Sequence, residues 1–233
     1  MCPVFERLIG ADDLGKASHV GHLRFTFSGP RLYSILIEAT RPSVVTSTPT
    51  NVTFPNGKVT VTSNNHVDIH GYTDERQDGI ITPTSIARHA EQFKGYFWAR
   101  ISSAAVVAEH GIVDNRTVHA GLREASGSLL SAYVLFAPAQ GKDTVIDVRV
   151  GTSLISESTA RSHIEAETPP ASSLEDTARV VREKWVEKLD RILVEGASEP
   201  QKEVFYTAVF HSLTVSWRSV ASERFSHPGA VPQ

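Results

Sequence analysis

Cysteine is almost absent from this sequence. Cys2 is the only cysteine in 233 residues, so no disulfide can form within the chain. A reducing compartment and a cysteine-poor secreted protein both fit this composition. Clusters of basic residues are missing too, because Lys and Arg are scattered and the formal net charge is −3. Since phosphate binding needs clustered cations, the composition argues against a nucleic-acid partner.

Membrane and nucleophile signatures are missing as well. Glu6 and Arg7 interrupt the short apolar run of residues 1–10, so we predict neither a signal peptide nor a membrane span there. There is no Gly-x-Ser-x-Gly elbow and no complete phosphate-binding loop of the Gly-x-x-x-x-Gly-Lys-Ser/Thr type. We therefore predict no membrane partner and no nucleophile of these classes.

The proportions of apolar and charged residues are ordinary for a globular protein. Apolar residues make up 40% of the chain and charged residues 21%, enough for one large or two small domains. Leu23, Phe25 and Phe27 alternate with polar residues, which places three large apolar side chains on one face of a strand. The first half of the chain therefore shows the two-residue period of β-structure.

Short strand-like runs recur between Gly, Pro and Asn turns, a pattern typical of an antiparallel β-sandwich. Asn56-Gly57 lies between the runs 51–54 and 58–62 and predicts a β-hairpin, because Asn-Gly tolerates the positive φ of tight turns. Residues 83–91 are the expected long loop. The other predicted strands are residues 33–39, 66–71, 80–81, 95–101, 104–108, 129–136 and 145–155.

Helical signals replace this pattern after Gly151. Ser156 begins a helix that runs to about Glu167, and Pro169-Pro170 ends it, because proline lacks the N–H that a helix interior needs. The chain therefore passes from a β-domain to an α-domain at this point.

Two more helices are predicted to follow. Ser173 and Asp176 resemble a capping box at the start of the second helix, which we expect to end at Gly196. Another capping box at residues 198–201 opens a third helix that runs to about Leu213. The apolar stripe of the second helix comprises Leu174, Ala178, Val181, Trp185, Leu189 and Ile192.

The segment in which the strands give way to helices, from about residue 147 to residue 213, resembles a known protein family. Its short motifs, in their order along the chain, resemble the domain junction of family 92 glycoside hydrolases. Looser similarity to fungal members extends upstream to about Ala17. The junction motifs are residues 147–156, 160–161, 164–167, 185, 189–192, 195–197 and 205–213, and the upstream ones are 19–27, 38–43, 51–57, 75–78 and 95–100.

The resemblance implies a fold and a domain organisation. The family comprises calcium-dependent exo-acting α-mannosidases that invert the anomeric centre, built from an N-terminal β-sandwich and an (α/α)6 barrel. We therefore expect a mainly β chain with a C-terminal α part. An incomplete sandwich would cover residues 1–155, linker helices 156–195, the first barrel helix 196–213 and a divergent tail 214–233.

The function implied is that of a parent enzyme. We expect it to hydrolyse terminal α-mannosidic bonds of mannose-containing glycans, to need calcium and to be secreted. The family's catalytic acid, base and calcium ligands lie beyond this chain, so we assign no catalytic residue here and expect no bound calcium and no turnover. Two alternatives stay open: a non-catalytic carbohydrate-binding or interaction sandwich, and a non-functional partial gene product.

Three alternating polar residues form a candidate metal-ligand set. His66, Asp68 and His70 would project from one face of a strand, and imidazole and carboxylate groups both bind metals. No fourth ligand is identifiable, and a solvated polar face explains the same pattern, so we assign no metal site. The charged segment 75–78 either borders a sugar site or forms a salt-bridged turn.

His211 is the one candidate for substrate binding. The resemblance places sugar-contacting residues shortly after the third helix, so His211 either lines a mannose subsite or is a packed, hydrogen-bonded histidine. Glu165 and Glu167 match no catalytic motif and are expected to be surface carboxylates, as are Asp12 and Asp13. 

Two sequons and three tryptophans complete the candidates. Asn51-Val52-Thr53 and Asn115-Arg116-Thr117 permit N-glycosylation if the chain is exported. Trp98, Trp185 and Trp217 have the flat rings that stack on sugars, although Trp185 belongs to the helix stripe and Trp98 to a strand, which favours structural roles.

Overall fold

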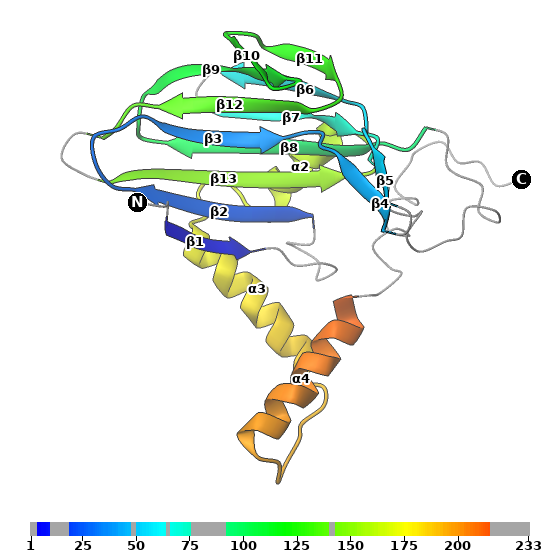
Figure 1. Cartoon of the computed structure of the whole chain (residues 1–233). Helices are drawn as coiled ribbons and strands as arrows, with labels where there is room; N and C mark the ends of the chain where they lie inside the picture. The colour runs from blue at the N-terminus through cyan, green and yellow to red at the C-terminus, as the bar shows by residue number, and fades with distance from the viewer. Residues whose placement is uncertain are drawn as a thin grey trace, which may run out of the picture.

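Two antiparallel sheets lie face to face in the described part of the chain (Figure 1). The structure is a computed structural model and describes residues 4–9, 19–47, 50–63, 66–75, 92–139 and 143–214. In spatial order the larger sheet contains β1 (Val4–Ile9), β2 (Val20–Phe27), β13 (Thr144–Ser153), β8 (Gly95–Ser103), β7 (Val67–Thr73), β6 (Gly57–Ser63) and β11 (Glu124–Gly127). The smaller sheet contains β10 (Thr117–Ala120), β9 (Val107–Asp114), β12 (Leu130–Phe136) and β3 (Tyr33–Glu38), while β4 (Ser43–Ser47) pairs with β5 (Thr50–Thr53).

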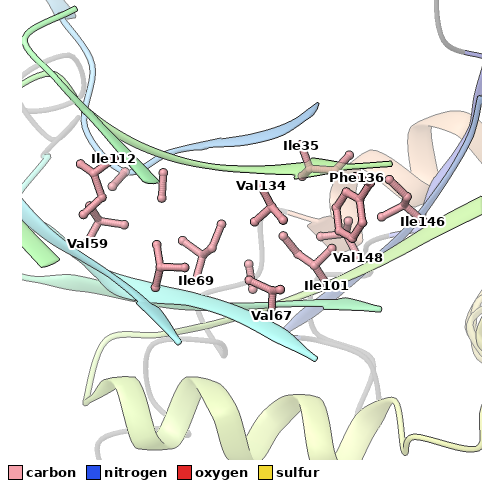
Figure 2. Packing of buried hydrophobic residues seen from close by; sticks show 14 of the residues in the cluster. Ile35, Val59, Val67, Ile69, Ile101, Ile112, Val134, Phe136, Ile146 and Val148 are labelled. Atoms are coloured by element: carbon pink, nitrogen blue, oxygen red, sulfur yellow. The ribbon is translucent and has the colours of Figure 1, made fainter. Parts of the chain in front are cut away.

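The core lies between the two sheets, as the alternating pattern predicts. Ile146 and Val148 of β13 point inward and are buried, as are Val134 and Phe136 of β12 (Figure 2). Leu23, Phe25 and Phe27 of β2 are half-buried and pack against this cluster. The predicted sandwich is therefore confirmed, and burial of its apolar faces is the main force that holds the sheets together.

The predicted hairpin at Asn56-Gly57 is wrong. The strand before it, β5, pairs with β4, whereas β6 starts at Gly57 and pairs with β7 and β11. Gly57 is needed for close packing, because a Cβ there would lie 2.3 Å from the backbone oxygen of Tyr72. A two-residue hairpin turn does lie between β9 and β10, at Asn115 and Arg116.

Three helices follow the sheets in the described residues: α2 (Glu157–Glu167), α3 (Leu174–Leu189) and α4 (Glu199–Thr214). Ser156 caps α2 by accepting from the Thr159 N–H, and Ser173 and Asp176 form the predicted capping box of α3. Helix α2 lies against the outer face of the larger sheet, while α3 and α4 extend away from the sandwich (Figure 1). The predicted β-to-α order is therefore confirmed.

The predicted end of the second helix at Gly196 is wrong. Helix α3 ends at Leu189, and the Asp190 N–H donates to the Val186 carbonyl as its C-cap. In the connection to α4, the Tyr206 hydroxyl donates to the Ile192 carbonyl at 3.0 Å and accepts from the Val194 N–H at 3.4 Å. Ile192 is therefore outside the helical stripe, and 51% of its surface is exposed.

Some sequence predictions concern residues outside the described ranges. These are the strand at 80–81, the loop at 83–91, the divergent tail from residue 215 onward, and Asp12, Asp13 and Trp217. Four described strands, β1, β4, β10 and β11, were not predicted. Of the helices in the described ranges, none combines the length and apolar character that a bilayer crossing requires.

Candidate functional site

The outer face of the larger sheet carries polar side chains in rows across the strands. Arg149 of β13 lies between His22 of β2 and Arg100 of β8, and Arg100 lies opposite Asp68 of β7. Because cross-strand partners share one face of a sheet, these charged groups are neighbours although the chain between them is long. Helices α2 and α3 contact this same sheet, so this polar face is the junction between the sandwich and the helices.

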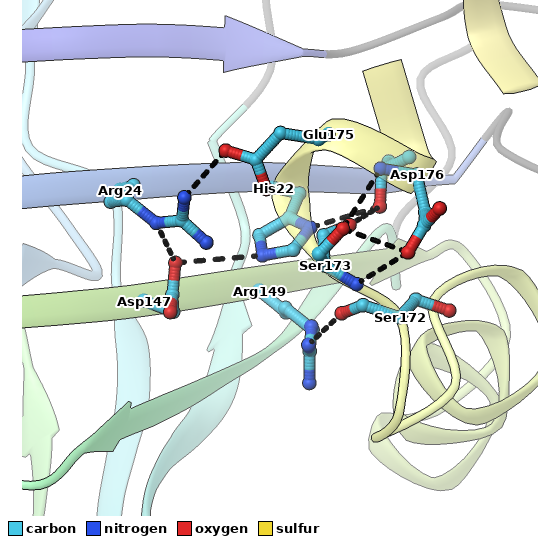
Figure 3. Close-up of polar contacts among 9 residues, drawn as sticks. His22, Arg24, Asp147, Arg149, Ser172, Ser173, Glu175 and Asp176 are labelled. Carbon is cyan, nitrogen blue, oxygen red and sulfur yellow. Dashed lines mark hydrogen bonds and ion pairs between the residues drawn. The ribbon is translucent and has the colours of Figure 1, made fainter. Parts of the chain in front are cut away.

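His22 anchors α3 to the sheet (Figure 3). Its side chain is fully buried, and its Nδ1 lies 3.0 Å from Oγ1 of Thr177. The Thr177 hydroxyl donates to the Ser173 carbonyl, so Nδ1 carries the proton and donates to Oγ1, leaving Nε2 without one. Burial, followed by the nearby positive charge of Arg149, lowers the pKa of His22 to about 4. The imidazole is therefore neutral at physiological pH.

Two arginines hold the first turn of α3 beside His22. Arg24 donates through Nε to Asp147 at 2.9 Å and through Nη1 to Glu175 at 2.6 Å (Figure 3). Arg149 donates to the Ser172 carbonyl at 2.7 Å, just before the helix. The start of α3 is thereby fixed to both β2 and β13, which are adjacent strands of the larger sheet.

Helix α2 is held at both of its ends. At its N-terminus, His70 Nδ1 lies 2.5 Å from Glu157, and the His70 ring stacks on Trp98 at 4.0 Å. At its C-terminus, Glu167 accepts from the His19 backbone N–H at 3.1 Å and lies 2.8 Å from His19 Nδ1. Both ends of α2 thus contact strands or residues adjoining strands of one sheet.

Gly151 allows the middle of α2 to approach the sheet closely. A Cβ at this position would lie 2.2 Å from the Ala160 carbonyl oxygen and 2.9 Å from the Ile164 side chain. Ala160 and Ile164 are the buried residues of α2. The glycine therefore sets the distance between the helix and β13, and any side chain there would push them apart.

His66, just before β7, and Asp68 and His70 within it alternate along the chain as the predicted common face requires, but they contact protein groups. Asp68 forms a buried ion pair with Arg100, with Oδ1 3.1 Å from Nε, and His66 Nε2 lies 3.1 Å from Asp68 Oδ2. His70 is engaged by Glu157. Within the described ranges, no group of three or more His, Cys, Asp or Glu side chains is arranged to hold a metal ion. These residues do not fit the calcium site that the family implies.

The carboxylates of this junction contact arginine and histidine side chains. Glu165 accepts from Arg161 at 3.0 Å, as expected of a surface carboxylate. Glu167 was expected at the surface too, but its side chain is only 8% exposed because it is covered at the contact with His19. A general acid for glycoside hydrolysis needs a proton to give to the leaving oxygen, and its partner must be free to activate water. Carboxylates that are already engaged by arginine and histidine do not meet that requirement.

The other candidate residues are not brought together by the structure. His211 lies in the last turn of α4, is exposed, and meets the Phe210 ring edge to face at 5.6 Å. Trp185 is half-buried against Leu174 and Val181, consistent with the predicted stripe. Asn115 is exposed in the β9–β10 turn. Asn51 lies in β5, with its side chain outside the description, and residues 76–78 of the charged segment also lie outside it.

Sequence reasoning missed the residues that anchor α3. His22, Arg24 and Arg149 occupy the polar positions of strands whose apolar positions are correctly predicted. On α3, Thr177 lies 155 residues from His22 and Glu175 lies 151 residues from Arg24. Ser172, just before α3, lies 23 residues from Arg149. One feature of the sequence could have indicated them. These strands carry histidine and arginine, which form strong hydrogen bonds, on the face opposite the buried apolar side chains.

Comparison with known families covers nearly the whole chain. Residues 13–153 match the glycosyl hydrolase family 92 N-terminal domain, and residues 159–224 match the glycosyl hydrolase family 92 catalytic domain. No curated protein matches the sequence closely enough to count as a relative.

Several solved structures share the fold. The family GH92 inverting mannosidase BT2199 from Bacteroides thetaiotaomicron is 18% identical, with a TM-score of 0.68 over 85% of this chain and 23% of its own. The GH92 family glycosyl hydrolase ccman5 is 18% identical, with a TM-score of 0.66 over 89% and 24%. The α-mannosidase BT3965 in complex with mannoimidazole is 16% identical, with a TM-score of 0.59 over 84% and 23%. This chain therefore spans about a quarter of the length of the structures it matches.

Proposed function

The chain belongs to glycosyl hydrolase family 92, and from this we propose that it is the N-terminal sandwich and domain junction of an enzyme that hydrolyses terminal α-mannosidic bonds of glycans with inversion. The observation that carries the proposal is the pair of consecutive family matches, to the N-terminal domain over residues 13–153 and to the catalytic domain over 159–224. The fold shared with an inverting mannosidase, and with an α-mannosidase solved with mannoimidazole, supports it.

In this proposal the described residues position the catalytic domain. An inverting glycosidase needs two carboxyl groups about 6.5–9.5 Å apart, one to protonate the leaving oxygen and one to activate water. That geometry tolerates little movement of one part of the enzyme against another. Helix α2 is fixed at Glu157 and Glu167, and α3 at Thr177 and Glu175, so the helices leave the sandwich in a defined direction.

The catalytic acid and base, and the calcium that the family resemblance implies, are assigned to the remainder of the enzyme. No step of the reaction is routed through the residues described here. His211 stays a candidate sugar contact, because it lies on the helix that leads into the rest of the catalytic domain. The parent enzyme is proposed to enter the secretory pathway, on the basis of the two sequons and the glycan substrate.

The test is to extend the chain with the coding sequence that follows it in the gene and to assay the longer product. We expect release of mannose from an aryl α-mannoside, loss of this activity on calcium chelation, and a first-formed sugar of inverted configuration by NMR. A longer product that contains no catalytic domain, or that releases no mannose, would refute the proposal.

The 233-residue chain provides the control. It is expected to release no mannose, because the acid and base are assigned elsewhere. Mannoside binding by this chain in a calorimetric titration, unaffected by a chelator, would indicate a carbohydrate-binding sandwich in place of the proposed role.

A further inference from the structure

The hairpin between β9 and β10 presents an Asn-x-Thr sequon at its tip. Asp114 and Thr117 pair across the turn, which leaves Asn115 and Arg116 as its two central residues. Their φ angles are 45° and 68°, so both are positive, as a type I′ turn requires. Asparagine is one of the few residues that tolerate this backbone region. The acceptor residue of the sequon therefore has a well-defined place at the end of two paired strands.

The whole sequon is accessible. Asn115, Arg116 and Thr117 are all exposed. The Asn115 backbone N–H donates to the Leu129 carbonyl at 3.2 Å, which ties the turn to the neighbouring connection. No hydrogen bond among the described residues engages its side-chain amide. A transferase can therefore reach the amide without first unfolding any part of the core.

We propose that Asn115 carries an N-linked glycan. This inference rests on the secretory location proposed for the parent enzyme. The Asn115 side-chain nitrogen forms a bond to C1 of an oligosaccharide that a membrane lipid carries as its diphosphate ester. The bond between C1 and the diphosphate oxygen breaks, the lipid diphosphate leaves, and the amide gives one proton to a base of the transferase. No oxidant or reductant is involved.

A glycan here would protect an open sheet edge. Strand β10 is the edge of the smaller sheet, and all four of its residues are exposed, including Val118 with 61% of its surface accessible. An exposed edge strand can pair with another chain, and proteins commonly block such edges. A bulky, hydrated sugar at the first end of β10 obstructs a second strand that approaches along this edge.

The modification is tested by translating the 233-residue chain behind an added signal peptide with endoplasmic-reticulum microsomes. Only the protease-protected, translocated fraction is analysed, with and without an endoglycosidase. We expect Asn115→Gln to remove one endoglycosidase-sensitive mobility step. Thr117→Ser is the matched control, because it preserves the sequon and should keep the step. Asn51→Gln separates any contribution of the second sequon.

The outcomes are distinct. If translocated wild-type chain and Asn115→Gln migrate alike, Asn115 is not an acceptor and the proposal is overturned. Because only translocated chain is scored, this result does not depend on whether the parent enzyme is itself exported. Mapping of a signal peptide in the longer gene product tests that separate question.

The shielding role is measured by light scattering: enzymatic removal of the glycan should increase aggregation, and Val118→Lys should reverse the increase. Equal scattering before and after deglycosylation would refute that role.

Discussion

Acidification from about pH 7.5 to about pH 5 is expected to destabilise the fold through His22. The unfolded chain takes up a proton on this imidazole near the ordinary pKa of 6.5, whereas the folded chain does so only near 4. Between these values the unfolded state binds more protons, so stability falls as the pH falls. The contribution is fully present above the ordinary pKa and is lost progressively down to the lowered one.

The size of the effect follows from the two pKa values. Linkage gives a loss of about 2 kcal/mol at about pH 5, which is a large fraction of the stability of a typical domain. The physical cause is that a charged His22 would be buried between β2 and α3, beside Arg149, with Asp147 no closer than 3.9 Å to Nε2. Thr177 satisfies the neutral ring and adds no negative charge.

The assay is urea unfolding followed by tryptophan fluorescence, with His22→Gln as the comparison. Glutamine keeps an amide donor for Thr177 but does not titrate. The variant should be less stable near neutral pH, and the difference from wild type should shrink by about 2 kcal/mol at about pH 5. Histidines that lie beside carboxylates, such as His19 and His70, occur in both proteins and cancel in this difference. A gap that is independent of pH would refute the reasoning.

Three further changes test the fold at other points. Gly151→Ala should destabilise the chain by about 1–3 kcal/mol in urea unfolding, because its Cβ meets the α2 backbone; Gly95→Ala, whose Cβ meets nothing closer than 3.9 Å, should change stability little, and equal effects would contradict the account. Arg116→Gly should stabilise the chain by about 1 kcal/mol, because glycine adopts positive φ without strain; a lower urea midpoint would argue against the type I′ turn. Arg24→Gln should speed hydrogen exchange in the first turns of α3 while leaving α4 unchanged, and unaltered exchange would show that the arginine does not hold the helix.

Much of the fold follows from local patterns in the sequence. The alternation in β2 correctly identifies the side chains that face the core, because one buried face is enough to specify a strand's register. The caps at Ser156 and Ser173 correctly locate two helix starts, because capping hydrogen bonds lie within four residues of one another. These features depend only on near neighbours in the chain.

The failures concern contacts between distant residues. Asn56-Gly57 has the composition of a tight turn, but the glycine is required by the approach of Tyr72, fifteen residues later. The turn at Asn115-Arg116 has positive φ at both residues but contains no glycine, so its composition predicts a tight turn only weakly. Local composition shows that a special backbone position exists, but it does not distinguish close packing from a positive φ.

The candidate site shows the same division. That His66, Asp68 and His70 share a strand face is predictable from their spacing of two residues. That Arg100 and Glu157 occupy their polar groups is not, because these partners lie 32 and 87 residues away. The outer face of the larger sheet was expected to be solvated, and it is instead covered by helices that come later in the sequence.

The position of β13 in the larger sheet has a consequence for synthesis on the ribosome. This strand lies between β2 and β8, so two parts of the sheet that are synthesised earlier are joined only through a strand that comes later in the sequence. A nascent chain therefore exposes two unfinished strand edges until Ser153 has left the exit tunnel. Long-range pairing of this kind closes slowly. Binding of chaperones to the nascent chain should therefore be strongest just before Ser153 emerges. It should decrease once β13 has paired with β2 and β8.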